Sequence, residues 1–319
     1  MQVLSGLNEL TSLPAGTALS IGNFDGLHRG HRLILQTCRR LVGAGGKVAV
    51  VTFEPHPLTV LRPELAPPRL TPPSLKETIL QRAGVDYLVV LPPEPEVLNL
   101  TAEAFWAMLR DQVRPAYLVE GEEFNFGKGR GGTIHKLREW ARGTAVKLEV
   151  VKAVEVALTD LSVVRISSTL VRYLLAFGRV RDAAICLGRA YVLEGKVVEG
   201  YRRGRQIGMP TANLDCGDQL VPADGVYVGR CEIEARMYPA AVSIGRMPTF
   251  GENKRQIEAH LIGFDGDLYG RTIQLDMIDW IRDQMKFPSI DQLKTRMARD
   301  LQWTAERASF DPSTQIAAL

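Results

Sequence analysis

Cysteine is scarce in this chain of 319 residues, and its spacing carries no pattern. Cys38, Cys186, Cys216 and Cys231 are scattered and form no C-x-x-C pair. This spacing excludes the usual zinc-ligand motifs and a disulfide framework. The cysteines are typical of a protein that stays in a reducing cytoplasm.

Long apolar runs, an export signal, internal repeats and low-complexity tracts are also missing. No stretch approaches the roughly 18 apolar residues of a membrane span. Residues 1–6 lack the basic and apolar regions of a signal peptide. We therefore expect a soluble, cytoplasmic protein without a membrane partner.

A strong excess of one charge is absent as well. The net charge is +3 and 24% of the residues are charged, which is too balanced for a general nucleic-acid binder. We expect no nucleic-acid partner, so any anion site must be local. The length and the 45% hydrophobic content suffice for two domains, each with its own core.

The N-terminal half alternates strand-like and helical segments. The strand-like runs are 18–21, 47–53, 87–91, 116–119 and 148–154. Ser74 with Glu77 predicts a capping box, and Thr101 predicts the start of a further helix. The alternation indicates an α/β fold with a doubly wound parallel sheet, whose ligands lie at the carboxyl ends of its strands.

The remaining segments outline a surface loop and a second domain. The proline-rich stretch 62–73 predicts a connecting loop rather than a helix or a central strand. After a helical segment at 169–187, short strands with Gly and Asp-Gly turns, such as 224–225 and 265–266, predict a small antiparallel barrel or sandwich. An amphipathic helix over 289–302 closes the chain. The predicted domains are 1–187 and 188–319.

Two histidines, His28 and His31, follow the apolar run 18–21 within GNFDGLHRGH, residues 22–31. A strand that enters a glycine-rich turn and then a helix presents backbone N–H groups at the positive end of the helix dipole, where anions bind. Imidazolium neutralises charge that develops on phosphorus. Two histidines at a helix start are often only surface or cap residues, but the strand, the glycines and the following amphipathic helix favour a phosphate site.

Three other segments contain candidate site residues. In RISSTLVR, Ser168 or Thr169 would cap a helix that attracts anions, although a plain cap with a solvated Arg172 explains the same residues. Residues 200–213 combine glycines and arginines with Thr211 and Asn213 oxygens, which suit a nucleotide and Mg²⁺; a nucleic-acid patch is the rival interpretation. On strand 257–261, Glu258 points away from the apolar face.

Seven motifs in order resemble the bacterial bifunctional riboflavin kinase/FAD synthetase family, and the N-terminal half resembles the nucleotidylyltransferase superfamily. The motifs are GNFDGLHRGH, VTFEPHP, EGEEFNFGKGRGG, RISSTLVR, LGRAYVLEGKVVEGYRRGRQIGMPTANL, SIGRMPTF and IEAHLIGFDGDLYG. The resemblance covers about residues 18–300. It implies a nucleotidylyltransferase-type sheet domain followed by a riboflavin kinase barrel with a terminal helix, and riboflavin, FMN and ATP as substrates with Mg²⁺.

The resemblance also implies a role for individual residues. His28 and His31 would bind and stabilise ATP phosphates during adenylyl transfer to FMN. The same turn adds Gly22, Asn23, Phe24, Asp25 and Gly26, and a second phosphate-binding element consists of Ser167, Ser168, Thr169 and Arg172. The kinase site would consist of Gly200, Arg205, Gly208, Pro210, Thr211 and Asn213, with Thr211 and Asn213 as metal ligands. Glu258 would be the general base that deprotonates the ribityl 5′-hydroxyl.

Some positions depart from the family pattern. Asn125 stands where many members have arginine, Ser243 where asparagine is common, and Gln284 where a carboxylate is frequent. Asn125 is a candidate flavin or phosphate contact, but it would equally satisfy its own turn. The departures leave open which residues contact the flavin.

Two alternative functions remain open at this point. One is a nucleotidylyltransferase with another phosphorylated acceptor, such as a polyol or pantetheine. The other is a flavin-binding or nucleic-acid-binding module without turnover. The sequence also leaves open whether the chain forms a weak homo-oligomer.

Overall fold

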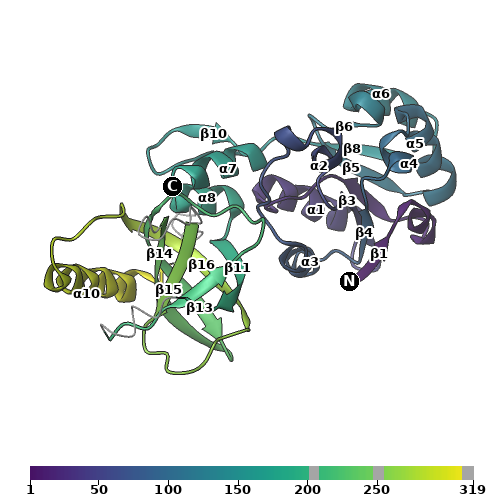
Figure 1. Ribbon diagram of the computed structural model, residues 1–319. Helices are drawn as coiled ribbons and strands as arrows, with labels where there is room; N and C mark the ends of the chain where they lie inside the picture. Colours follow the sequence, from purple (N-terminus) through teal and green to yellow (C-terminus); the bar gives the residue numbers. More distant parts are fainter. Residues whose placement is uncertain (201–207, 247–254, 311–319) are drawn as a thin grey trace. The chain divides into compact units, whose positions relative to one another are not determined.

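The computed structural model describes residues 1–200, 208–246 and 255–310 (Figure 1). The chain forms two compact units: Met1–Pro67 with Pro73–Glu155, and Pro68–Pro72 with Val156–Leu319. The boundary between these packing units, at 155/156, differs from the predicted boundary between the functional domains at 187/188. The functional boundary stays a prediction. Arg205 lies outside the described residues.

The first unit contains a six-stranded parallel sheet in the order β1-β4-β3-β2-β5-β8. Its strands are β1 (Gln2–Ser5), β2 (Ala18–Ile21), β3 (Val48–Phe53), β4 (Tyr87–Leu91), β5 (Tyr117–Gly121) and β8 (Lys147–Val151). The five predicted strands and the doubly wound parallel sheet are confirmed. β1 was not predicted. The strand order reverses between β2 and β5, which is where such sheets bind ligands.

Helices connect these strands. They are α1 (Arg29–Val42), α2 (Leu58–Leu61), α3 (Pro73–Arg82), α4 (Pro95–Leu98), α5 (Ala102–Met108) and α6 (Ile134–Ala141). The predicted cap at Thr101 is confirmed, because its Oγ1 accepts the Ala104 N–H at 3.1 Å. The capping box at Ser74 is wrong: α3 begins at Pro73, whose fixed φ suits the first turn of a helix.

The sheet is packed by one apolar cluster and by the inner side of α1. The cluster joins Leu19, Ile21 and Val51 of the strands with Phe105 and Trp106 of α5. The proline-rich stretch connects two helices, as predicted, and contains one short 3-10 turn at Pro63–Leu65. The prediction that it lies on the surface is wrong at Leu70 and Thr71, which are buried. A two-stranded ribbon, β6 (Asn125–Phe126) with β7 (Gly132–Thr133), follows β5.

The second unit contains a closed barrel in the order β11-β12-β15-β14-β13-β16. Its strands are β11 (Tyr191–Val198), β12 (Ala212–Asp215), β13 (Gly225–Ile233), β14 (Arg236–Arg246), β15 (Arg255–Leu261) and β16 (Thr272–Arg282). All its pairs are antiparallel, and α10 (Ile290–Arg307) follows. The predicted barrel with a terminal helix is confirmed. Among the described residues, no helix combines the length and the apolar character needed to cross a membrane.

Two local predictions in this unit are wrong. The segment predicted as one helical stretch contains α7 (Ser168–Ala176) and α8 (Val180–Leu187), separated at Gly178, which has a φ of 71°. The Asp-Gly pairs at 224–225 and 265–266 are not the predicted hairpin turns: Gly225 begins β13, and 265–266 lie between β15 and β16, which are not neighbours in the barrel. The β13–β14 hairpin turns at Glu234 and Ala235, both with positive φ. Neither residue is a common choice for such a turn, so this turn could not be predicted from residue types.

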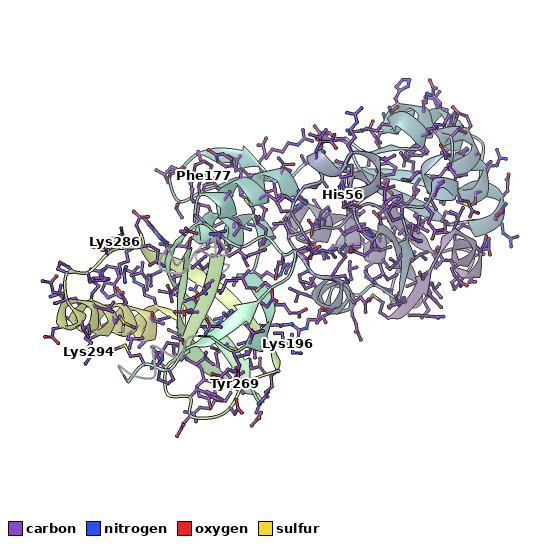
Figure 2. The ribbon with its side chains drawn as sticks, in the orientation of Figure 1. His56, Phe177, Lys196, Tyr269, Lys286 and Lys294 are labelled. Atoms are coloured by element: carbon purple, nitrogen blue, oxygen red, sulfur yellow. The ribbon has the colours of Figure 1, made fainter. Side chains whose placement is uncertain are left out.

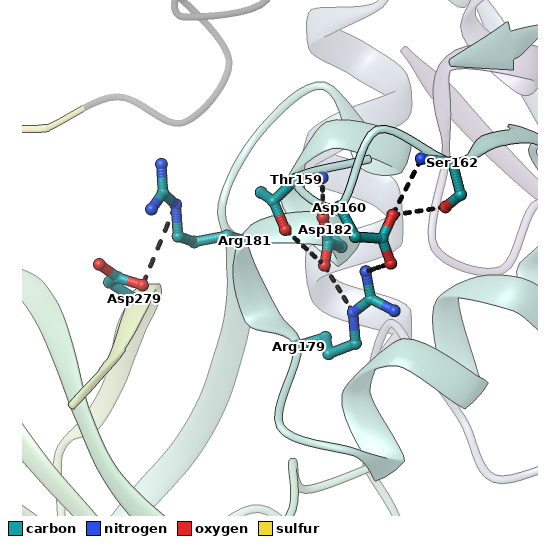
Figure 3. Close-up of polar contacts among 7 residues, drawn as sticks. All are labelled: Thr159, Asp160, Ser162, Arg179, Arg181, Asp182 and Asp279. Carbon is teal, nitrogen blue, oxygen red and sulfur yellow. Dashed lines mark hydrogen bonds and ion pairs between the residues drawn. The ribbon is translucent and has the colours of Figure 1, made fainter. Parts of the chain in front are cut away.

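A polar network fixes α8 within this unit (Figure 3). Asp182, which is 3% exposed, accepts the Thr159 N–H at 2.7 Å, its hydroxyl at 3.1 Å and the Arg179 Nε–H at 2.6 Å. Arg179 also reaches Asp160 at 2.7 Å. Hydrogen bonds from Ser162, and then from Arg179, lower the pKa of Asp160 to about 2. The network ties the β9 (Glu155–Ala157) to β10 (Val163–Arg165) connection to the start of α8.

We expect Asp182→Ala to destabilise this unit by about 1–3 kcal/mol, because it leaves the Thr159 N–H and the Arg179 guanidinium without this acceptor. Urea unfolding followed through the barrel tryptophan Trp280 would measure the change. Asp160→Ala removes an exposed carboxylate from the same network and should cost less. Equal losses in the two variants would contradict this ranking.

A segment from the N-terminal half of the sequence also packs in this unit. Arg69 forms an isolated parallel bridge with Gln219, and its carbonyl accepts the Leu220 N–H at 2.7 Å. The buried Gln219 amide donates to Leu70 O at 3.1 Å and to Val192 O at 2.7 Å. Residues Pro68–Pro72 therefore form a strap on the second unit, which the sequence did not predict.

Candidate functional sites

The predicted histidine turn connects the end of β2 to α1. His28 is the N-cap of α1, and its Nδ1 accepts the His31 N–H at 3.3 Å. The two rings stack with centroids 3.7 Å apart and planes at 15°. His28 is 8% exposed, and the ring of Phe24 lies 4.9 Å from that of His31. The two imidazoles therefore act as one paired surface at the positive end of the helix dipole.

The backbone of this turn is tightly constrained. Phe24, Gly26 and Leu27 have φ values of 46°, 83° and 41°, and the side chains of Phe24 and Leu27 are buried. Positive φ at two bulky residues is uncommon and clusters at functional sites. A Cβ at Gly30 would lie 3.1 Å from the His28 ring, so glycine there lets that ring sit over the helix start.

The turn is also anchored to the neighbouring strand β3. The Gly22 amide donates to Val51 O at 2.9 Å, and the Thr52 hydroxyl donates to Asn23 O at 3.1 Å. Asp25 is 8% exposed within the same turn. The structure thus brings together the predicted set of Gly22, Asn23, Phe24, Asp25, Gly26, His28 and His31 at the carboxyl edge of the sheet.

Asn125 lies on the ribbon strand β6 of the first unit. Its Nδ2 donates to Glu123 O at 2.6 Å, two residues earlier. This bond satisfies the local turn, which is the simpler of its two predicted roles. Its role as a flavin or phosphate contact stays a prediction.

The predicted second phosphate element lies at the start of α7, within the second compact unit. Ser167, rather than Ser168 or Thr169, is the N-cap, and its Oγ accepts the Leu170 N–H at 3.1 Å. Ser168 and Thr169 occupy the first turn. Arg172 Nε donates to Pro68 O of the strap at 2.8 Å. That contact fixes one side of the guanidinium, and a phosphate role for it stays a prediction.

The barrel places two candidate residues side by side. Asn213 on β12 pairs with Glu258 on β15, and Glu258 pairs on its other side with Ser243 on β14. Cross-strand partners share a face of the sheet, about 5 Å apart. Ile257, Ala259 and Leu261 are buried while Glu258 and His260 are half-buried, so Glu258 points away from the barrel core, as predicted.

The segment that precedes Asn213 is held close to β15. His260 Nδ1 donates to Pro210 O at 2.7 Å and so ties the Pro-Thr-Ala-Asn segment to β15. A Cβ at Gly200 would overlap the Asn213 side chain. Gly208 has a φ of 81° and is exposed. Gly200 thus lies against the Asn213 side chain, and His260 holds Pro210 beside β15.

A cavity of about 600 Å³ opens beside these residues. Its wall includes Pro210, Thr211 and Ala212 from one side and Asp265, Asp267 and Tyr269 from the connection after β15. Tyr269 is labelled in Figure 2. Sequence reasoning missed this second wall, although GFDGDLYG was one of the quoted motifs. A cavity of this size suits a nucleotide.

Gln284 is a further residue whose contacts the sequence did not predict. Its Nε2 donates to Ser243 Oγ and to Ile244 O, both at 2.9 Å. The two departures from the family pattern at 243 and 284 are therefore in direct contact. Within the described ranges, no cluster of three or more His, Cys, Asp or Glu residues could hold a metal ion.

The structure places one group of candidate residues on a parallel sheet and another on a barrel, and this two-domain fold is that of a transferase. A FAD synthetase family model matches residues 10–169, and a riboflavin kinase model matches residues 187–308. The bifunctional riboflavin kinase/FMN adenylyltransferase of Escherichia coli K12 is 36% identical over 94% of this chain and 96% of its own. The enzyme of that name from Pseudomonas fluorescens is 35% identical over 98% of this chain and 99% of its own.

One solved structure also matches over nearly the whole length. It is a Streptococcus pneumoniae chain described as a macrolide-efflux protein, 30% identical, with a TM-score of 0.85 over 97% of this chain and 100% of that one. The chain belongs to the bifunctional riboflavin kinase/FMN adenylyltransferase family. It is a transferase with an N-terminal FAD synthetase domain and a C-terminal riboflavin kinase domain, a family that uses ATP and typically a divalent metal.

Proposed function

We propose that the chain phosphorylates riboflavin to FMN with ATP and then adenylylates FMN to FAD with a second ATP. The kinase reaction is assigned to residues 188–319 and the adenylyltransferase reaction to residues 1–187. The observation that carries the proposal is that each family domain has its own assembled site: the stacked His28 and His31, and the paired Asn213 and Glu258.

In adenylyl transfer, an FMN phosphate oxygen attacks the α-phosphorus of ATP. The bond from that phosphorus to the bridging oxygen breaks, and pyrophosphate leaves. His28 and His31 stabilise the developing charge together with the N–H groups at the start of α1, which supports catalysis by positioning and electrostatics alone. Ser167, Ser168, Thr169 and Arg172 are proposed as the second phosphate-binding element.

In riboflavin phosphorylation, Glu258 accepts the proton of the ribityl 5′-hydroxyl. The oxygen then attacks the γ-phosphorus of ATP, and ADP leaves. The pairing of Glu258 with Asn213 supports this assignment, because it places the base beside the proposed nucleotide segment. The cavity along Pro210–Ala212 has the volume for the nucleotide.

Thr211 and Asn213 are proposed as Mg²⁺ ligands. Their hydroxyl and carbonyl oxygens are of the type that Mg²⁺ accepts, and the missing Cβ of Gly200 leaves the room that the Asn213 side chain takes up. When bound, the ion neutralises charge on the ATP phosphates. The protein residues contribute the orientation of those oxygens.

Gly200→Ala should lower riboflavin kinase activity by about tenfold to a hundredfold, because the new Cβ displaces Asn213. The Mg²⁺ concentration for half-maximal activity should rise. Gly45→Ala is the control, since a Cβ there meets open space. Unchanged Mg²⁺ dependence in Gly200→Ala would count against Asn213 as a ligand.

The proposal is tested by incubating the protein with riboflavin, ATP and Mg²⁺ and separating the flavins over time. FMN that rises and then gives way to FAD supports both reactions. FMN without FAD would favour another phosphorylated acceptor for the N-terminal domain. No flavin product, with salt-sensitive oligonucleotide binding, would favour the binding-module alternative.

We further propose that the partners are these small molecules alone, without nucleic acid or membrane, and that the reactions take place in the cytoplasm. The four cysteines support this location, since all of them are free thiols.

A further inference from the structure

The carboxyl end of β2 is held differently by its two neighbours. Toward β3 the ladder continues to the end, with Ile21 opposite Val51 and the Gly22 amide donating to Val51 O. Toward β5 the pairing covers only Ala18 and Leu19. The β2–β5 ladder therefore ends before the two strands do.

A side chain replaces the ladder where it ends. Alternate amides along a strand point to opposite neighbouring strands. On the β3 side, the Ala18 amide donates to Lys47 O and the Gly22 amide donates to Val51 O. The Ile21 amide accordingly points to β5, where it donates to Glu120 Oε1 at 2.8 Å. A carboxyl oxygen thus stands where a regular parallel ladder has a backbone carbonyl.

The contact between Ile21 and Glu120 lies next to the histidine turn. The strand order reverses between β2 and β5, and Ile21 immediately precedes the turn that leads to His28. Gly22 and Asn23 anchor the turn to β3, and Glu120 anchors the strand end on the β5 side. The turn is therefore held from both sides.

We propose that Glu120 is a positioning residue of the adenylyltransferase site, whose carboxyl group fixes the strand end from which the histidine turn departs. The proposal rests on the proposed function of that site. Glu120 acts through the Ile21 amide and the turn, and it is not assigned a contact with substrate.

Burial favours the neutral form of this carboxyl group. Glu120 is 2% exposed, and burial raises its pKa well above the ordinary value, while the weaker effect of the Ile21 N–H lowers it. β2 has no titratable side chain. On β8, Lys147 and Glu149 pair with Tyr117 and Val119, so they lie on the face of the sheet opposite to Glu120. No cation among the described residues contributes to the pKa shift of Glu120.

Helix α1 also packs against β5, and its buried titratable group is Cys38. Burial, and then the negative charge that Glu120 carries once it ionises, raise the pKa of that thiol to about 12. His28 caps the helix, and its other titratable side chains are half-buried or exposed: Arg29, His31, Arg32, Arg39 and Arg40.

The direction of the pH effect follows from the raised pKa. The neutral form is favoured in the folded state, so its contribution to stability is complete below the ordinary value near 4.5 and is lost as pH rises through the folded-state value. Ionised Glu120 would be a buried charge without a cation, and the strand end would shift to admit water. Adenylyl transfer should then decline as pH rises through that folded-state pKa.

The test compares Glu120→Gln, Glu120→Leu and the control Glu149→Leu in the full chain, with FMN and ATP as substrates, from acidic to alkaline pH. Gln keeps an acceptor for Ile21 without a titrating proton and should retain activity but lose the decline with rising pH. Leu removes the acceptor and should lower kcat/KM for FMN adenylylation by about tenfold to a hundredfold. Riboflavin phosphorylation, which is assigned to residues 188–319, gives the reference rate in each variant, and hydrogen exchange of the β3 amides checks that the first unit is folded.

Two outcomes would overturn the proposal: an unaltered pH profile in Glu120→Gln, or normal adenylylation in Glu120→Leu. Hydrogen exchange of the Ile21 amide gives a readout that needs no substrate. Faster exchange in Glu120→Leu, with protection retained in Glu120→Gln, would support the positioning role. If the wild-type chain makes no FAD, the proposed function fails while the exchange result still decides the structural role of Glu120.

Discussion

His28→Ala is expected to lower FMN adenylylation by about a hundredfold to a thousandfold while leaving riboflavin phosphorylation unchanged. The substitution removes one of two stacked imidazoles at the start of α1 and the cap that accepts the His31 N–H. Riboflavin phosphorylation by the same chain is therefore the reference against which the loss of FMN adenylylation is measured. The measurement is the initial rate of FAD formation from FMN and of FMN formation from riboflavin.

Two controls separate chemistry from folding in this experiment. His28→Asn keeps a side chain that caps helices well but removes the imidazole, so it should be nearly as inactive as His28→Ala and more stable by about 1 kcal/mol. His135→Ala changes an exposed histidine of the same unit and should leave both rates intact. Equal loss of both activities in folded His28→Ala would refute the assignment of separate sites.

Glu258→Gln should have the reverse effect. It keeps the shape of the side chain but removes the proton acceptor, so riboflavin phosphorylation should fall by about 10²–10⁴-fold while FAD formation from supplied FMN continues. Asn213→Ala, which changes the cross-strand neighbour of Glu258, should share this phenotype. The initial rates of FMN formation from riboflavin and of FAD formation from FMN measure the effect in both variants.

Glu232→Gln is the matched control, because Glu232 is an exposed carboxylate on a strand of the same barrel. It should leave both rates unchanged. A Glu258→Gln variant that phosphorylates riboflavin normally would exclude this residue as the general base. The pH dependence of the residual activity gives a second check, since the acidic limb that a base produces should disappear with Glu258.

Much of the fold could be predicted because its signals are local. Runs of apolar residues marked the inner strands, and period-two alternation placed Glu258 on the outer face of β15. β1 escaped prediction because QVLS is short and mostly exposed at the sheet edge. The break between α7 and α8 depends on Gly178 in a left-handed conformation, and a lone glycine within a helical pattern is a weak stop signal.

The parts of the sites that depend on long-range packing could not be predicted. Three glutamates occur in EGEEF, and nothing in their spacing tells that the first is buried against Ile21, 99 residues earlier. The contact of Arg172 with Pro68 and the Ser243–Gln284 pair likewise join residues that are far apart in the chain. Sequence patterns identified residue types suited to phosphate, whereas tertiary structure decides which of them touch.

The strap at Pro68–Pro72 makes the two compact units indivisible by a single cut of the chain. The polypeptide contributes five residues to the second unit, returns to complete the first with Pro73–Glu155, and only then supplies the barrel. A fragment that begins at the riboflavin kinase match, residue 187, would leave the Gln219 amide without its Leu70 acceptor and the Leu220 amide without the Arg69 carbonyl. During synthesis, nearly half of the chain must follow the strap before Gln219 and Leu220 exist to bind it.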